Sequence, residues 1–171
     1  MNNPKLQNHK LKLKLDAEKE RYSAAEGSFN GIRSRCLALL SVEMVLITYF
    51  FSDLRSIIPS EIYGIIFFAI GIISIIASAG LSLYSIRPIT WPDPIGPEEY
   101  VKLDYAKDEN ECLKVFANDY TLSAEEAKRL TAKQAQIFKY SLLLFVFGLI
   151  MLLIIKFFWK ENCHDNVRHH H

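Results

Sequence analysis

Glu43 is the residue whose chemistry most needs an explanation, because it lies inside a long apolar stretch of the sequence. An ionised carboxylate at the centre of a bilayer costs about 2.5–3.5 kcal/mol even on insertion scales, so we expect the side chain to face protein. In a structural role, Glu43 is protonated or hydrogen-bonded to a Ser or Thr of a neighbouring helix. In a functional role it lines a pore or binds protons, and a ring of such carboxylates in an oligomer favours cations.

Small residues follow one side of the next apolar stretch. At 100° per residue they fall within about a quarter of the helix circumference, interrupted by Phe67. Small side chains let helices approach closely, so we expect this stripe at a helix interface of a homo-oligomer, with a hydroxyl-lined channel as the alternative. The stripe consists of Ser60, Gly64, Gly71, Ser74, Ser78, Ser82 and Ser85.

The sequence contains no familiar catalytic or cofactor-binding signature. It has no phosphate loop, no dinucleotide fingerprint, no His-Glu-x-x-His and no paired cysteine motif. Cys163, His164 and Asp165 are metal-ligand types, but three adjacent residues in a tail cannot close a tetrahedral site. We therefore expect no enzymatic activity, no cofactor and no metal site.

The distribution of apolar residues predicts the class of protein. Half of the 171 residues are hydrophobic, and 20 Lys and Arg against 19 Asp and Glu leave a net charge of +1, so no direct nucleic-acid binding is expected. A helix needs about 20 residues to cross about 30 Å of hydrocarbon. We predict an all-α membrane protein with three transmembrane helices, at residues 36–52, 57–86 and 139–160, and with helical cytoplasmic extensions. The first two spans form a hairpin over residues 36–86.

Residues 1–35 are predicted to form an amphipathic cytoplasmic helix. Apolar side chains recur every seven residues as far as Cys36, and Glu43 occupies the next position of the same series. Gly27 and Gly31 each cost about 1 kcal/mol relative to Ala, which favours a bend there, and an exposed strand at residues 10–15 is the alternative. The cytoplasmic seam includes Leu15, Tyr22, Phe29 and Ile32.

The segment between the second and third spans divides into a connector and helices. Residues 87–97 contain four prolines, which predict a semi-rigid connector. Residues 98–138 are predicted to form two cytoplasmic helices, one beginning after Pro97 and a second at Ser123, whose spacing to Glu126 fits a capping box. Residues 161–171 form a tail whose final three histidines resemble the remnant of a purification tag.

Lys and Arg counts predict the orientation of the spans in an inner (plasma) membrane. The first 35 residues hold eight, the segment from Arg87 to Lys139 holds eight, and the hairpin turn holds only Arg55. The amino terminus and the connector should therefore face the cytoplasm. The third span should place the carboxyl terminus outside.

Two features of the chain resemble SLATT-type and related small transmembrane effectors of bacterial antiviral conflict systems. One is the charged arm Glu18-Lys19-Glu20-Arg21-Tyr22 before a tight hairpin, and the other is Asn118-Asp119-Tyr120 before a helix that enters the last span. The resemblance implies an oligomeric effector that permeabilises or depolarises the membrane when a cytoplasmic sensor or regulatory protein triggers it. The third span departs from the minimal two-span pattern. A nonenzymatic accessory or scaffold subunit of a membrane complex is the alternative.

Overall fold

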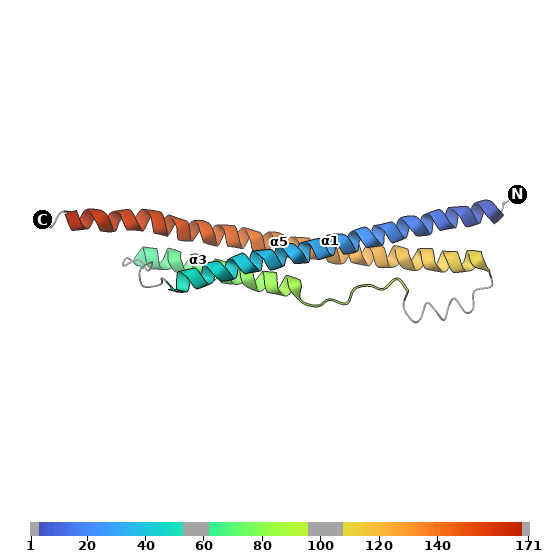
Figure 1. Cartoon of the computed structure of the whole chain (residues 1–171), viewed down its shortest axis with the longest axis horizontal. Coiled ribbons are helices and arrows are strands. Elements are labelled where there is room, and N and C mark those ends of the chain that lie inside the picture. Colours follow the sequence, from blue (N-terminus) through green and yellow to red (C-terminus); the bar gives the residue numbers. More distant parts are fainter. Residues whose placement is uncertain (1–3, 53–61, 96–107, 169–171) are drawn as a thin grey trace. The chain divides into compact units, whose positions relative to one another are not determined.

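A computed structural model describes the backbone of residues 4–52, 62–95 and 108–168, and the side chains of these residues except 4–6, 51 and 157–168. This part of the chain contains three α-helices and no strand, so the predicted all-α class is confirmed for it (Figure 1). The helices are α1 (Pro4–Ser52), α3 (Ile62–Ile86) and α5 (Glu109–Arg168).

Two helices are long and apolar enough to cross a membrane, judged by length and composition. They are α3 and the Glu109–Lys156 portion of α5. These two helices suggest that the protein associates with a membrane, as the three-span prediction requires. The predicted first span, residues 36–52 of α1, is not one of the two.

Helix α1 continues without interruption through its two glycines. A Cβ atom added to Gly27 or Gly31 would meet no atom within 4 Å, so no close approach of another backbone requires a glycine at either position. Residues 10–15 are helical, and the strand alternative for them is wrong. The apolar positions of this stretch are therefore used at helical spacing and not at the two-residue spacing of a strand.

Helix α5 begins after Asp108, whose carboxylate caps the helix. Asp108 Oδ1 accepts a hydrogen bond of 2.8 Å from the Glu111 backbone N–H, and Glu109 and Glu111 place negative charge in the first turn. The predicted helix start at Ser123 is wrong, because Ser123 lies inside α5 and is buried. The helix has no reason to end there, since its buried face continues on both sides of Ser123 through Ala117, Ala124 and Ala127.

Some predicted features lie outside the described residues. These are the hairpin turn with Arg55, Ser60 of the small-residue stripe, the helix start after Pro97, the side chains of Cys163, His164 and Asp165, and the three terminal histidines.

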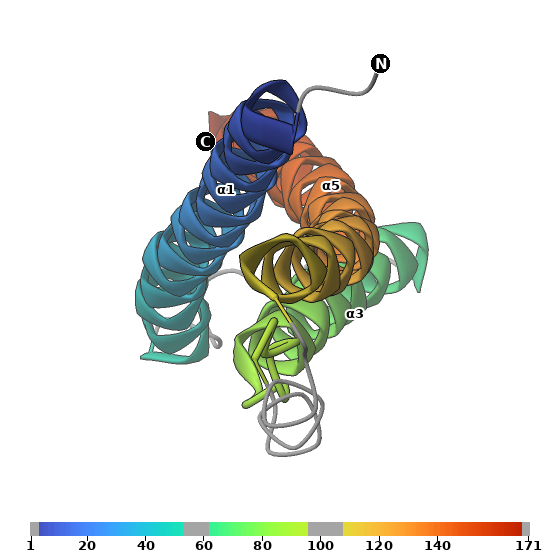
Figure 2. The same cartoon turned by 90° about the vertical axis from the view of Figure 1, so that its right-hand side faces the viewer.

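The chain divides into two compact units, and α1 and α5 each contribute to both. The arm unit comprises residues 1–32 and 88–134. The span unit comprises residues 33–87 and 135–171. In Figures 1 and 2 the span unit contains the teal end of α1, the green α3 and the orange-to-red end of α5.

In the arm unit, α1 and α5 run parallel. Lys12 Nζ lies 2.8 Å from Glu109 Oε1, and further along both helices the Thr131 hydroxyl donates to the Ala25 carbonyl oxygen at 3.2 Å. Hydrogen bonds from Lys12 and Asn8, together with the charge of Lys12, lower the pKa of Glu109. These contacts join the beginning of α5 to the amino-terminal half of α1.

An aromatic cluster ties the connector to the same two helices. The Trp91 ring centroid lies 4.7 Å from that of Phe29 and 6.2 Å from that of Tyr22, which in turn lies 6.1 Å from Tyr120. The Tyr22 hydroxyl donates to the Pro92 carbonyl oxygen at 2.7 Å. Burial and the charge of Glu26 raise the pKa of Tyr22, so the phenol keeps the proton that it donates.

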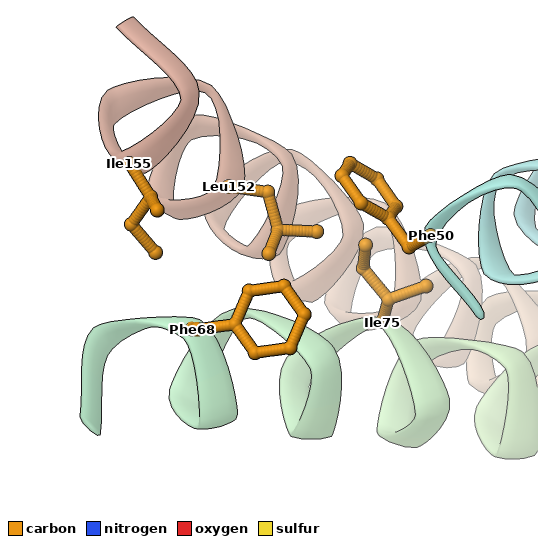
Figure 3. Close-up of a cluster of buried hydrophobic side chains, with 5 residues drawn as sticks. All are labelled: Phe50, Phe68, Ile75, Leu152 and Ile155. Carbon is orange, nitrogen blue, oxygen red and sulfur yellow. The ribbon is translucent and has the colours of Figure 1, made fainter. Parts of the chain in front are cut away.

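In the span unit, three helical segments pack around a small apolar core. Figure 3 shows side chains from all three helices pointing toward one another. The pairs Cys36 with Ser85 and Glu43 with Ser78 show that α1 and α3 run antiparallel. The core consists of Phe50 from α1, Phe68 and Ile75 from α3, and Leu152 and Ile155 from α5.

Candidate functional site

Glu43 lies inside the span unit, and its side chain is completely shielded from the surroundings of the protein. Its exposed fraction is 0%, although the side chain carries an ionisable group. The position follows from the seven-residue spacing of α1, because Cys36 and Phe50, one heptad before and after Glu43, are also buried. The carboxyl group is therefore directed into the helix bundle by the same stripe that buries its apolar neighbours.

Three serines complete a polar cluster around this carboxyl group. The Ser78 hydroxyl is hydrogen-bonded to Glu43 Oε1 and lies 2.7 Å from the Ser141 carbonyl oxygen. Ser141 Oγ lies 3.0 Å from Ser78 Oγ and 2.8 Å from Ser82 Oγ, and the Ser141 hydroxyl donates to the Ser78 carbonyl oxygen at 3.0 Å. We call Glu43, Ser78, Ser82 and Ser141 the Glu43 cluster. All four side chains are 0% exposed.

No side chain in the described part of the chain neutralises the Glu43 carboxyl group with an ion pair. Its second oxygen, Oε2, is buried and has no hydrogen-bond partner among the described residues. An isolated buried carboxylate is costly, because hydroxyl dipoles replace only part of its hydration. The site is therefore a carboxyl group solvated by serine hydroxyls and not a salt bridge.

The small-residue stripe of α3 packs inside its own chain. The five stripe positions from Gly64 to Ser82 are all buried, and two of them, Ser78 and Ser82, belong to the Glu43 cluster. The Ser74 hydroxyl donates to the Ile70 carbonyl oxygen of the same helix at 2.8 Å. The stripe consists of Gly64, Gly71, Ser74, Ser78 and Ser82, followed by the buried Ser85.

The expected use of this stripe between two copies of the chain is therefore corrected. A Cβ atom added to Gly71 would lie 3.0 Å from the Leu152 side chain and 3.3 Å from the Gly148 carbonyl oxygen. The small residues thus allow α3 to approach α5 of the same molecule, which leaves the stripe covered. Small residues allow close helix approach here, as expected from the sequence. The helix that approaches belongs to the same chain and not to a second copy.

Two important residues of α5, Ser141 and Gly148, were not identified from the sequence. They are seven residues apart within an apolar run, and Leu152 and Ile155 continue the same buried face. This seven-residue spacing of small residues could have identified the face of α5 that packs against α3. A Cβ atom added to Gly148 would lie 2.8 Å from the Gly71 carbonyl oxygen, so α3 and α5 approach each other closely at these two glycines.

The seam residues Leu15, Tyr22, Phe29 and Ile32 lie in the arm unit and do not contribute to the Glu43 cluster. Leu15 and Phe29 are buried, whereas Tyr22 and Ile32 are half-buried. Glu18 of the same helix is also buried and accepts a hydrogen bond of 3.2 Å from Arg21. The seam thus organises the arm helix, its connector and the first part of α5.

The span unit has polar groups inside and large apolar groups outside. Leu-, Ile- and Phe-sized side chains are exposed on all three helices, while the hydroxyl and carboxyl groups of the Glu43 cluster are buried. Water-soluble proteins rarely expose extended apolar surfaces of this kind. Exposed examples are Val42, Val45 and Tyr49 on α1, Ile66, Ile73 and Leu83 on α3, and Leu143, Phe147 and Ile150 on α5.

Comparisons with protein-family models, curated protein sequences and solved structures found no match. The resemblance to small transmembrane effectors therefore depends on the sequence features alone. Within the described residues, no group of three or more His, Cys, Asp and Glu side chains is placed to hold a metal ion.

Proposed function

We propose that the chain is a three-span integral membrane protein in which residues 36–52 of α1 form the first span. The inverted polarity of the span unit supports this assignment most strongly. Along α1, Val42, Met44 and Val45 are exposed on either side of the fully buried Glu43. In lipid this arrangement satisfies both demands, because apolar side chains meet the hydrocarbon and the polar groups meet one another.

We further propose that this bundle is an oligomeric inner-membrane effector of bacterial antiviral defence that permeabilises or depolarises the membrane. A sensor or regulatory protein on the cytoplasmic side acts as the trigger. The observation that carries the proposal is the Glu43 cluster, which gathers a carboxyl group and three hydroxyls along neighbouring helix faces. In the closed bundle these groups are buried, and helix separation would expose them as a polar path through the membrane.

Membrane potential tests the proposed function. Overproduction in bacteria should collapse the potential reported by a voltage-sensitive dye, because an open bundle conducts ions. Ser85→Cys provides a matched control, since Ser85 Oγ lies 3.3 Å from Cys36 Sγ and a disulfide there would hold α1 against α3. Purified protein in liposomes should leak ions when this disulfide is reduced and should leak much less when it is formed. An unchanged membrane potential in cells, together with equal leakage in both redox states, would contradict the effector function.

Cysteine labelling tests the proposed topology. We expect an impermeant thiol reagent applied to intact spheroplasts to modify Cys163 and to spare Cys112, because three spans after a basic arm place the carboxyl terminus outside. Cys36 is 0% exposed and should remain unmodified in the folded protein, which makes it an internal control. Labelling of Cys112 with protection of Cys163 would show that the protein has the opposite orientation in the membrane.

The second candidate is a nonenzymatic accessory or scaffold subunit of a membrane complex. The closed character of the Glu43 cluster favours it, because the three serine hydroxyls and Glu43 Oε1 are already hydrogen-bonded within one chain. A scaffold would keep this arrangement throughout its function. It would therefore leave the membrane potential intact in the dye experiment.

A further inference from the structure

We propose that Glu43 is a proton-binding site, at which the carboxyl group holds a proton in the closed bundle and donates it in a hydrogen bond to Ser78. The ligand is a single proton taken from water. The inference concerns the span unit alone and does not require that the chain conducts ions. It goes beyond the proposed function because it assigns a specific protonation state to a specific group.

The hydrogen bonds of Ser78 carry the inference. Its hydroxyl oxygen is hydrogen-bonded to Glu43 Oε1 and also lies 2.7 Å from the Ser141 carbonyl oxygen. A hydroxyl group carries one hydrogen, a carbonyl oxygen carries none, and an ionised carboxylate carries none. With an ionised Glu43 the two contacts would have to share the single Ser78 hydrogen, whereas a proton on Glu43 gives each contact a hydrogen of its own.

A proton on Glu43 gives every hydroxyl and carboxyl hydrogen of the cluster an acceptor. Glu43 then donates to Ser78 Oγ, and the Ser78 hydroxyl is free to donate to the Ser141 carbonyl oxygen at 2.7 Å. The Ser141 hydroxyl donates to the Ser78 carbonyl oxygen at 3.0 Å, and the Ser82 hydroxyl donates to Ser141 Oγ at 2.8 Å. Each of the four hydrogens then has its own acceptor.

Loss of the proton would break this order. Ser78 would have to donate to the carboxylate, which would leave its oxygen facing the Ser141 carbonyl oxygen with no hydrogen between them. The negative charge would also stand in a buried site whose second oxygen, Glu43 Oε2, has no partner among the described residues. Ionisation of Glu43 should therefore push α1 away from α3 and α5.

No charged group of the packed helices compensates a Glu43 carboxylate. On α1, Arg35 and Tyr49 are exposed, Arg33 Nη2 donates to the Ile86 carbonyl oxygen at 2.8 Å, and the Cys36 thiol is hydrogen-bonded to Ser85. The remaining described Lys, Arg and Tyr side chains of the unit are also exposed: Tyr63 and Tyr84 on α3, Arg87 just after it, and Lys139, Tyr140 and Lys156 on α5. Hydroxyl groups are thus the nearest polar neighbours from both other helices.

Infrared spectroscopy of the full chain in lipid nanodiscs tests the site directly. At neutral pH the wild-type protein should show the carbonyl-stretch band of a protonated carboxylic acid, and Glu43→Gln should remove this band. Labelling glutamate with ¹³C at the side-chain carboxyl should shift the band, which assigns it to Glu and not to Asp even if the variant fails to fold. Glu18→Gln is the matched control and should leave the band unchanged, because Glu18 is also buried on α1 but is paired with Arg21.

The pH dependence of stability provides a second readout. A native state that keeps the proton binds more protons than the unfolded state above about pH 4.3, so its stability should fall as the pH rises. The unfolding equilibrium constant of the wild type should rise about tenfold per pH unit relative to Glu43→Gln, whose amide donates to Ser78 at every pH. A wild-type protein without the protonated-acid band at neutral pH, or with the same pH slope as Glu43→Gln, would overturn the inference. Neither result depends on membrane permeability.

Discussion

Gly148→Leu should separate α5 from α3 and unfold the span unit, whereas Gly80→Leu should leave the fold intact. At Gly148 even a Cβ atom would lie 2.8 Å from both the Gly71 carbonyl oxygen and Ile75 Cγ1. The carbonyl belongs to the backbone of α3, so the new side chain can be accommodated only if one helix moves. At Gly80 an added Cβ would meet nothing within 4 Å.

The two substitutions add the same atoms to a helical glycine, so their difference isolates helix packing. Overpacking costs about 1–3 kcal/mol and more where backbone must move, and each kcal/mol lowers Tm by about 2–4 °C in a chain of this size. Gly80→Leu should instead be neutral or slightly stabilising, because Leu has a higher helix propensity than Gly. Thermal unfolding of the purified variants in detergent measures both. Equal Tm values would show that α3 and α5 do not approach at Gly148.

Ser78→Leu should be the second strongly destabilising substitution, and its neighbour provides the control. Ser78 is 0% exposed and contacts both Glu43 and Ser141, so a Leu there adds bulk and removes the hydroxyl that joins them. The overpacking costs about 1–3 kcal/mol, and the buried polar groups left without this partner cost about as much again. Ala77→Leu adds bulk at the next position, which is exposed on α3.

Unfolding in detergent and chemical cross-linking together measure the effect of Ser78→Leu. Ser78→Leu should unfold at a lower temperature than Ala77→Leu. Ala77→Leu should unfold like the wild type. The stripe packs within one chain, so neither substitution should change the oligomeric mass of protein that is still folded. A Ser78→Leu protein that unfolds like Ala77→Leu would show that the Glu43 cluster contributes nothing to helix association.

Residue periodicity alone predicted which face of α1 is buried. On the seven-residue spacing from Leu15 to Phe50, every position is buried in the structure except Tyr22, which is half-buried. The same reasoning identified the small-residue stripe of α3, whose members within the described residues are all buried. Periodicity succeeds here because a helix repeats its faces at a constant angle, so local sequence determines which side chains share a side.

Local sequence was less reliable where tertiary contacts outweigh a boundary signal. Ser123 and Glu126 have the spacing of a capping box, yet α5 continues through them because its buried alanine face extends on both sides. A capping interaction contributes about 1 kcal/mol, which is less than the packing of an uninterrupted helix face provides. Asp108, and not Ser123, caps the helix.

The sequence by itself predicted the helical class, the buried faces of α1 and α3, and the burial of Glu43 against protein. Only the tertiary structure decided which groups shelter it, since Ser78 is 35 residues and Ser141 about a hundred residues away along the chain. It also decided that the partner of the α3 stripe is α5 of the same molecule, through Gly71 and Gly148. The physical reason is that periodicity specifies the direction of a side chain around its own helix, whereas the identity of the facing helix depends on which surfaces fit closely together.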